Sequence, residues 1–205
     1  MTYLRLYLDI ETYRPKAAFE NEKIIACGFL LDNTFRESQN LNHEPKFEYF
    51  HVKKPSEEKR VLKQALDFIS GLGVNVEIVG FHILRFDIPL IISRVAKFGI
   101  MDVEKASSFF NNCFCIDYSQ VLLPTNGMKF KGLKLSTIIS TCKSMNLRIQ
   151  PPEYYSDGFK VKELFERGRH EEIKKHCKAD LDATRWLDLY GAEELLKRRY
   201  VENKG

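Results

Sequence analysis

The sequence lacks the features that would place the chain in a membrane or outside the cell. None of its apolar runs reaches the about 18 residues that a membrane-spanning helix needs. Its first residues, Met1-Thr2-Tyr3-Leu4-Arg5, do not form the basic region, apolar run and cleavage site of a secretory signal. We therefore expect a cytoplasmic protein that makes no contact with a membrane.

The sequence also lacks a cysteine pattern for disulfides or zinc. There are 5 cysteines in 205 residues, an odd number, and no two of them stand in a Cys-x-x-Cys pair. Cys113 and Cys115 are too close together for the usual spacing of zinc ligands, which argues against a structural zinc site. Reduced and mostly buried thiols are expected.

No strong charge bias, internal repeat or low-complexity tract divides the chain. The net charge of +4 permits a polyanionic partner without requiring one. With 44% hydrophobic residues, the chain has enough apolar material for one folded core. We expect a single domain over residues 1–200, followed by a frayed tail at residues 201–205.

Apolar and polar residues alternate near the N-terminus, which is typical of a β-strand. Over residues 3–11, Leu6 and Leu8 fall on one face, and Asp9 and Glu11 fall on the other. Further strands are predicted at residues 24–31, 46–52, 76–81 and 113–118. Helices are predicted at residues 57–71, 88–98, 133–145 and 163–199, the last of them interrupted near Gly168 and Gly191. Three consecutive strands and a later alternation of strands with helices indicate an α/β sheet with one parallel half.

Asp9 and Glu11 form the first candidate site, because both side chains leave the same face of one strand. Two carboxylates this close repel each other, and each resists ionising unless a cation lies between them. Carboxylate oxygens are the ligands that Mg²⁺ and Mn²⁺ prefer. The alternative is an exposed strand end that carries two solvated acids.

Two further acids are candidates for the same site. Asp87 follows the strand predicted at residues 76–81, and the loops that follow parallel strands often bind ligands. The alternative is that Asp87 is an ordinary N-cap at the start of a helix. His176 and Asp180 lie four residues apart, so a helix places them on one face, either in a site or as a surface pair. Asp182 lies about 200° further round the helix and cannot share that site.

Three motifs in chain order contain these acids: Asp9-Ile10-Glu11-Thr12, Gly80-Phe81-His82-x-x-x-Phe86-Asp87-x-Pro89, and His176-Cys177-x-x-Asp180-Leu181-x-x-Thr184-x-x-Leu187. Together they resemble the three motifs of the DEDD (DnaQ-like) exonuclease superfamily. The similarity spans residue 3 to about residue 190. The pattern most resembles stand-alone exonucleases related to the proofreading domain of family B DNA polymerases.

The resemblance implies an α/β fold of the RNase H-like type, with a five-stranded mixed sheet in the order 3-2-1-4-5 flanked by helices. It implies two divalent cations, Mg²⁺ or Mn²⁺, held by Asp9, Glu11, Asp87 and Asp180. The expected activity is that of a 3′→5′ exonuclease that acts on the 3′ end of single-stranded DNA and releases nucleoside monophosphates. An RNA 3′→5′ exonuclease of the same fold and a catalytically weak nucleic-acid-binding relative are the alternatives.

The sequence departs from the family pattern at two histidines. His176 stands where similar members carry Tyr, while another branch carries His one residue further upstream. Because a His with a pKa near 6.5 can accept a proton from water at neutral pH, we hypothesise that His176 is a catalytic general base. His82 stands where Asn is usual, which puts the positioning of the substrate in doubt.

A protein that holds the end of a single-stranded nucleic acid needs aromatic side chains that stack on the bases and basic side chains that neutralise the backbone charge. The residues expected to bind it are Thr12, Tyr13, His82 and Phe86. Phe130 is a further stacking candidate, and the basic candidates are Lys129, Lys131, Lys134, Lys160 and Lys162. DNA is favoured over RNA only by the resemblance, since one contact to a 2′-hydroxyl can decide that choice. The oligomeric state is open.

Overall fold

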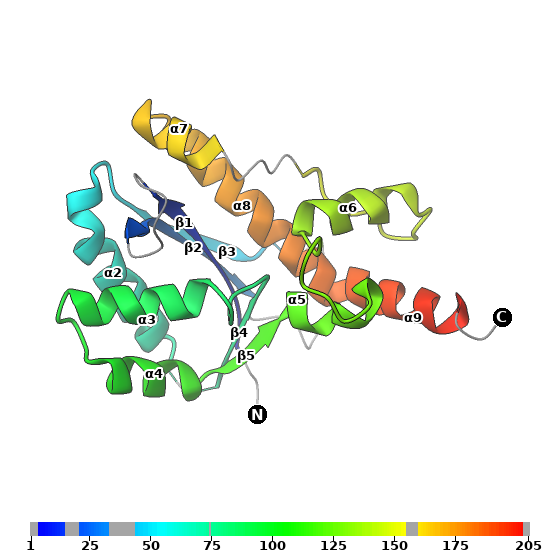
Figure 1. The fold of residues 1–205 in the computed structure, drawn as a ribbon, viewed down its shortest axis with the longest axis horizontal. Helices are drawn as coiled ribbons and strands as arrows, with labels where there is room; N and C mark the ends of the chain where they lie inside the picture. Colours follow the sequence, from blue (N-terminus) through cyan, green and yellow to red (C-terminus); the bar gives the residue numbers. More distant parts are fainter. Residues whose placement is uncertain (1–3, 15–20, 33–43, 74, 155–159, 203–205) are drawn as a thin grey trace.

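A five-stranded sheet with helices on both faces forms the centre of the molecule (Figure 1). The computed structural model describes residues 4–14, 21–32, 44–73, 75–154 and 160–202. The strands are β1 (Leu4–Tyr13), β2 (Lys23–Asp32), β3 (Lys46–His51), β4 (Val76–Gly80) and β5 (Phe114–Asp117), in the order β3-β2-β1-β4-β5. β1, β2 and β3 pair antiparallel, whereas β4 pairs parallel with both β1 and β5. The predicted α/β class, mixed sheet and strand order are confirmed.

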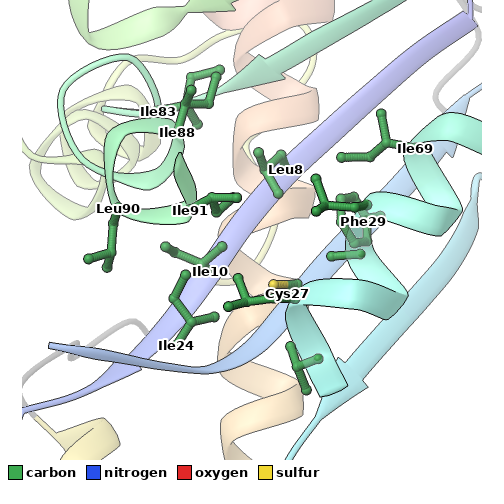
Figure 2. Packing of buried hydrophobic residues seen from close by; sticks show 14 of the residues in the cluster. Leu8, Ile10, Ile24, Cys27, Phe29, Ile69, Ile83, Ile88, Leu90 and Ile91 are labelled. Atoms are coloured by element: carbon green, nitrogen blue, oxygen red, sulfur yellow. The ribbon is translucent and has the colours of Figure 1, made fainter. Parts of the chain in front are cut away.

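The central strand β1 is buried on both faces. Leu8 and Ile10 point from β1 into one core, between Ile91 of α3 and Phe29 of β2 (Figure 2). Tyr7 belongs to a second core on the opposite face. The predicted alternation along β1 is therefore confirmed, but helices cover the polar face too, so that face is not a solvated surface.

The helices are α2 (Glu58–Gly71), α3 (Asp87–Lys97), α4 (Val103–Asn111), α5 (Tyr118–Val121), α6 (Leu135–Ser144), α7 (Val161–Glu166), α8 (His170–Trp186) and α9 (Ala192–Glu202). Short 3₁₀ turns occupy Pro55–Glu57 and Leu123–Asn126, and a π-helical turn at Leu187–Gly191 joins α8 to α9. In the described part of the chain, every helix is too short or too polar to span a lipid bilayer.

The long helical region predicted at residues 163–199 is divided where the glycines indicated. Gly168, in a left-handed conformation with φ of 69°, follows α7, and the π-helical turn ends at Gly191. Helices α4 and α5 were not predicted. α9 continues to Glu202, so the first two residues of the predicted frayed tail are helical, and residues 203–205 lie outside the described residues.

Helix α8 lies directly on the sheet, where it packs on β1, β2 and β4 (Figure 1). Gly28 of β2 makes this close approach possible, because a Cβ atom there would overlap the Sγ atom of Cys177 and lie 3.1 Å from Leu181. The absence of a side chain at Gly28 thus lets α8 bring His176 and Asp180 down to β1.

Candidate metal centre

Three of the four predicted acids line one cavity of about 530 Å³ beside β1, at the end of β4. They are Asp9, Asp87 and Asp180, which come from β1, α3 and α8. Glu11 is not among the residues that line this cavity; it is only 5% exposed, and its Oε1 atom lies 2.8 Å from Nδ1 of His176. The structure therefore brings together four carboxylates that are up to 171 residues apart in the sequence (180 − 9).

Asp87 is tied to the central strand. It is the first residue of α3, and its Oδ1 atom accepts a hydrogen bond of 3.2 Å from the backbone N–H of Ile10. The N-cap position belongs to Phe86, which makes no side-chain capping bond. The alternative in which Asp87 serves as the N-cap is therefore wrong.

His176 and Asp180 face β1 rather than solvent. Nδ1 of His176 lies 3.8 Å from Oδ2 of Asp180, one turn further along α8, as well as close to Glu11. Asp182 instead pairs with Lys178 at 2.7 Å, away from this group, as the helical geometry predicted. His176 also lines a separate hollow of about 560 Å³ between α7 and α8.

Burial and mutual repulsion work against ionisation of these acids. The pKa of Asp9 is raised well above its usual value, first by burial and then by Glu11, Asp180 and Asp87. Burial also raises the pKa of Glu11, although the hydrogen bond with His176 offsets part of the effect. Burial raises the pKa of Asp87 to about 7. The alternative of two solvated acids at an exposed strand end is thus wrong.

The atoms around Asp9 fit divalent cations that prefer oxygen. Its Oδ2 atom is buried and, among the described residues, has no hydrogen-bond partner. One ligand atom each of Asp9, Glu11 and Cys177 lie within 4.8 Å of one another. Burial, Asp9 and Glu11 raise the pKa of the Cys177 thiol far above its usual value, which favours a protonated thiol that hydrogen-bonds to Asp9 when no cation is bound. The carboxylate oxygens around this point are the ligands that suit Mg²⁺ or Mn²⁺.

The four residues predicted to bind a nucleic-acid strand lie in two places. His82 and Phe86 line the cavity. Thr12 and Tyr13 lie outside it, where the Thr12 hydroxyl bonds to Glu22 and the Tyr13 hydroxyl bonds to Glu166 at 3.2 Å. Contact of these four residues with a substrate remains a prediction.

One wall of the cavity is built around Asp117, whose role the sequence did not reveal. Asp117 is 3% exposed and accepts hydrogen bonds from the backbone N–H groups of His82, at 2.9 Å, and Leu84, at 3.1 Å. His82 has a φ of 66°, a left-handed conformation that His, like Asn, tolerates better than most residues. Its Nε2 atom lies 3.1 Å from the carbonyl oxygen of Leu133, which fastens two loops together. The sequence signal for this role of Asp117 is its position as a polar residue at the end of a short apolar strand.

Two solved structures with the same fold have names that connect them with DNA. The family B DNA polymerase of the hyperthermophilic archaeon Pyrobaculum calidifontis is 17% identical, with a TM-score of 0.62 over 95% of this chain and 24% of its own. The zinc-bound E. coli ExoI–ssDNA complex is 13% identical, with a TM-score of 0.55 over 98% of this chain and 43% of its own. This chain thus spans less than half of either neighbour, and at these identities the likeness establishes the fold. No family model and no curated protein sequence matches the chain.

Proposed function

We propose that this chain is a metal-dependent 3′→5′ exonuclease that shortens single-stranded DNA from its 3′ end and releases nucleoside monophosphates. The observation that carries the proposal is the convergence of four carboxylates, of which Glu11 and Asp87 are buried and Asp9 and Asp180 are half-buried. Such a group destabilises the folded protein unless cations offset the repulsion. The fold shared with a DNA polymerase and with an ExoI–ssDNA complex supports a nucleic-acid substrate.

The four carboxylates would hold two Mg²⁺ or Mn²⁺ ions through their oxygens. When bound, a pair of such ions assists the attack of water on a phosphodiester and stabilises the charge on the leaving 3′ oxygen. The contribution of the protein is to hold the four acids together in a site that is partly shielded from water, which strengthens their attraction for cations.

We assign the proton-accepting role to His176. An ionised Glu11 can only accept a hydrogen bond, so the Nδ1 atom that faces it carries the proton. Nε2 would then be the unprotonated ring nitrogen, and His176 would act as the base where the attacking water reaches that atom. Glu11 would thereby fix both the tautomer and the orientation of the imidazole.

Degradation of a 5′-labelled single-stranded DNA in Mg²⁺, Mn²⁺ or EDTA tests the proposal. We expect a ladder that shortens from the 3′ end with either metal and no ladder in EDTA or with Asp9→Ala. Asp182→Ala is the matched control, because it removes an acid from the same helix as Asp180 but outside the cavity. A ladder that persists in EDTA would contradict the metal-dependent reaction.

Two further substrates define the specificity. A circular single strand should stay intact, because it offers no 3′ end, and cleavage of the circle would indicate an endonuclease. A matched RNA strand should be shortened more slowly than DNA. Faster shortening of RNA would favour the RNA exonuclease instead.

A further inference from the structure

The loop between β4 and α3 carries an arginine that the proposed chemistry does not use. Arg85 is exposed and lines the same cavity as Asp9, Asp87 and Asp180. Its guanidinium carbon lies 3.8 Å from the centre of the Phe130 ring. The guanidinium therefore covers a face of the ring, where cation–π attraction and stacking restrict its motion.

Arg85 has no acidic partner in the described part of the chain, where no carboxylate oxygen lies within 4.0 Å of it. Other exposed arginines do pair, such as Arg60 with Glu57 at 3.2 Å and Arg167 with Glu163 at 3.7 Å. The positive charge of Arg85 thus lies over the Phe130 ring, beside the cavity that contains the acids. Among the described residues, no carboxylate accepts a hydrogen bond from its guanidinium. An anionic group of a ligand is the partner that such a side chain fits.

The ring beneath Arg85 is itself held in place. Asn126 donates hydrogen bonds from its side chain to the carbonyl oxygens of Lys129 and Lys131, on either side of Phe130. The contact between His82 and Leu133 then fastens this loop to the loop that carries Arg85. Little conformational freedom would be lost when Arg85 binds a ligand, because its position is already set.

We propose that Arg85, supported by Phe130, binds a backbone phosphate of the strand on the 5′ side of the bond that is cut. This inference rests on the proposed exonuclease function. The nucleotide that leaves is joined to the strand only through the phosphate under attack, so a second phosphate within reach must lie on the 5′ side. A planar guanidinium can bond to two phosphate oxygens at once. Because Arg85 occupies one face of Phe130, the ring supports the arginine there instead of stacking on a base.

Equilibrium binding of a 5′-labelled single-stranded DNA, followed by fluorescence anisotropy in EDTA, tests the contact without cleavage. Arg85→Ala should weaken binding about 5- to 20-fold, and Arg85→Lys should restore only part of the loss, since lysine cannot stack in the same way. Arg60→Ala is the matched control, because it removes an equal charge from α2, outside the cavity. It should change binding less than about twofold. Arg85→Ala binding equal to that of the wild type would overturn the inference.

Single uncharged methylphosphonate substitutions along the strand locate the phosphate. At one position on the 5′ side, neutralisation should weaken binding by the wild type but cause no further loss in Arg85→Ala. Losses that are equal in the two proteins at every position would overturn the contact. Phe130→Leu should weaken binding when it is introduced alone and have no further effect when it is combined with Arg85→Ala, because the ring acts through the arginine. If the losses from the two substitutions add, Phe130 does not act through Arg85.

The two proposals fail in distinguishable ways. If the wild type shortens DNA in Mg²⁺ while Arg85→Ala binds and cuts normally, the exonuclease stands and the phosphate contact is overturned. If the wild type neither binds nor shortens any strand, the proposed function fails, and the contact fails with it.

Discussion

At the scale of single residues, burial decides the charge of the acids. Asp87 illustrates this, because its usual pKa of 3.8 rises to about 7 in the folded protein, mainly through burial. The folded protein therefore holds this proton more tightly than the unfolded chain does. The resulting stability is fully present below the unfolded pKa and is lost as the pH rises through the folded pKa.

We expect the free energy of unfolding in EDTA to fall as the pH rises from about 4 to about 7, and Asp87→Asn to flatten part of that fall. Urea unfolding at constant ionic strength across this range measures it. The contribution should be on the order of a few kcal/mol. Asp182→Asn, which alters an acid outside the cavity, should leave the slope as in the wild type. An identical slope in wild type and Asp87→Asn would show that Asp87 does not carry the effect.

His176 also acts at the residue scale. If it is the general base, His176→Ala should lower the rate of strand shortening by about 10²- to 10⁴-fold. His176→Tyr should retain more activity and lose the dependence on a group that titrates near neutral pH, since tyrosine can orient water but stays protonated there. Rates measured against pH for both variants test this. A loss below about threefold in His176→Ala would remove this residue from the mechanism.

At the scale of secondary-structure elements, the seating of α8 on the sheet determines where the C-terminal acid lies. Gly28 faces Cys177 and Leu181 so closely that no side chain fits between β2 and α8. Because α8 also carries Asp180, any displacement of the helix moves one of the four acids away from the other three.

Gly28→Ala should therefore lower both stability and activity. The added methyl group would force α8 outward at a cost of about 1–3 kcal/mol, and the rate of strand shortening should fall more than about tenfold. Thermal unfolding and strand degradation measure the two effects. Gly71→Ala is the control, because nothing lies within 4 Å of a Cβ atom there. Adding Cys177→Ala to Gly28→Ala should recover part of the stability, and no recovery would contradict the steric explanation.

At the scale of the whole molecule, the sheet order brings together the acids of the proposed metal centre. β1 lies between an antiparallel half and a parallel half, and β4 ends beside Asp9 before the chain turns into α3. α8, from the far end of the sequence, covers the same part of β1. Three segments distant in sequence thus contribute acids to one cavity, and cations bound there would connect them.

Mn²⁺ should therefore stabilise the folded protein as a whole. At a concentration of about 100 times its dissociation constant, the gain is about 2.7 kcal/mol for one site. We expect thermal unfolding to shift upward with Mn²⁺ in the wild type and in Asp182→Ala, but much less in Asp9→Asn. An equal shift in all three proteins would place the binding of Mn²⁺ elsewhere.

Much of this arrangement could be predicted from local patterns. Period-two alternation located β1 and the shared face of Asp9 and Glu11, and helical spacing placed His176 beside Asp180 and excluded Asp182. The predictions failed where a residue serves a distant partner. Glu58, which lies in the helix predicted at residues 57–71, is fully buried and binds Arg94 and the backbone of Ile24.

The sequence by itself determined the strands, the main helices and the order in which the acids occur, because periodicity and turn residues act over short distances. Only the tertiary structure decided which side chains meet. Glu11 contacts His176 across 165 residues, Asp117 holds His82 in the cavity wall, and Arg85 lies on Phe130. These contacts depend on helix seating and loop packing, where a shift of about 1 Å makes or breaks a hydrogen bond, and such distances leave no periodic trace in the chain.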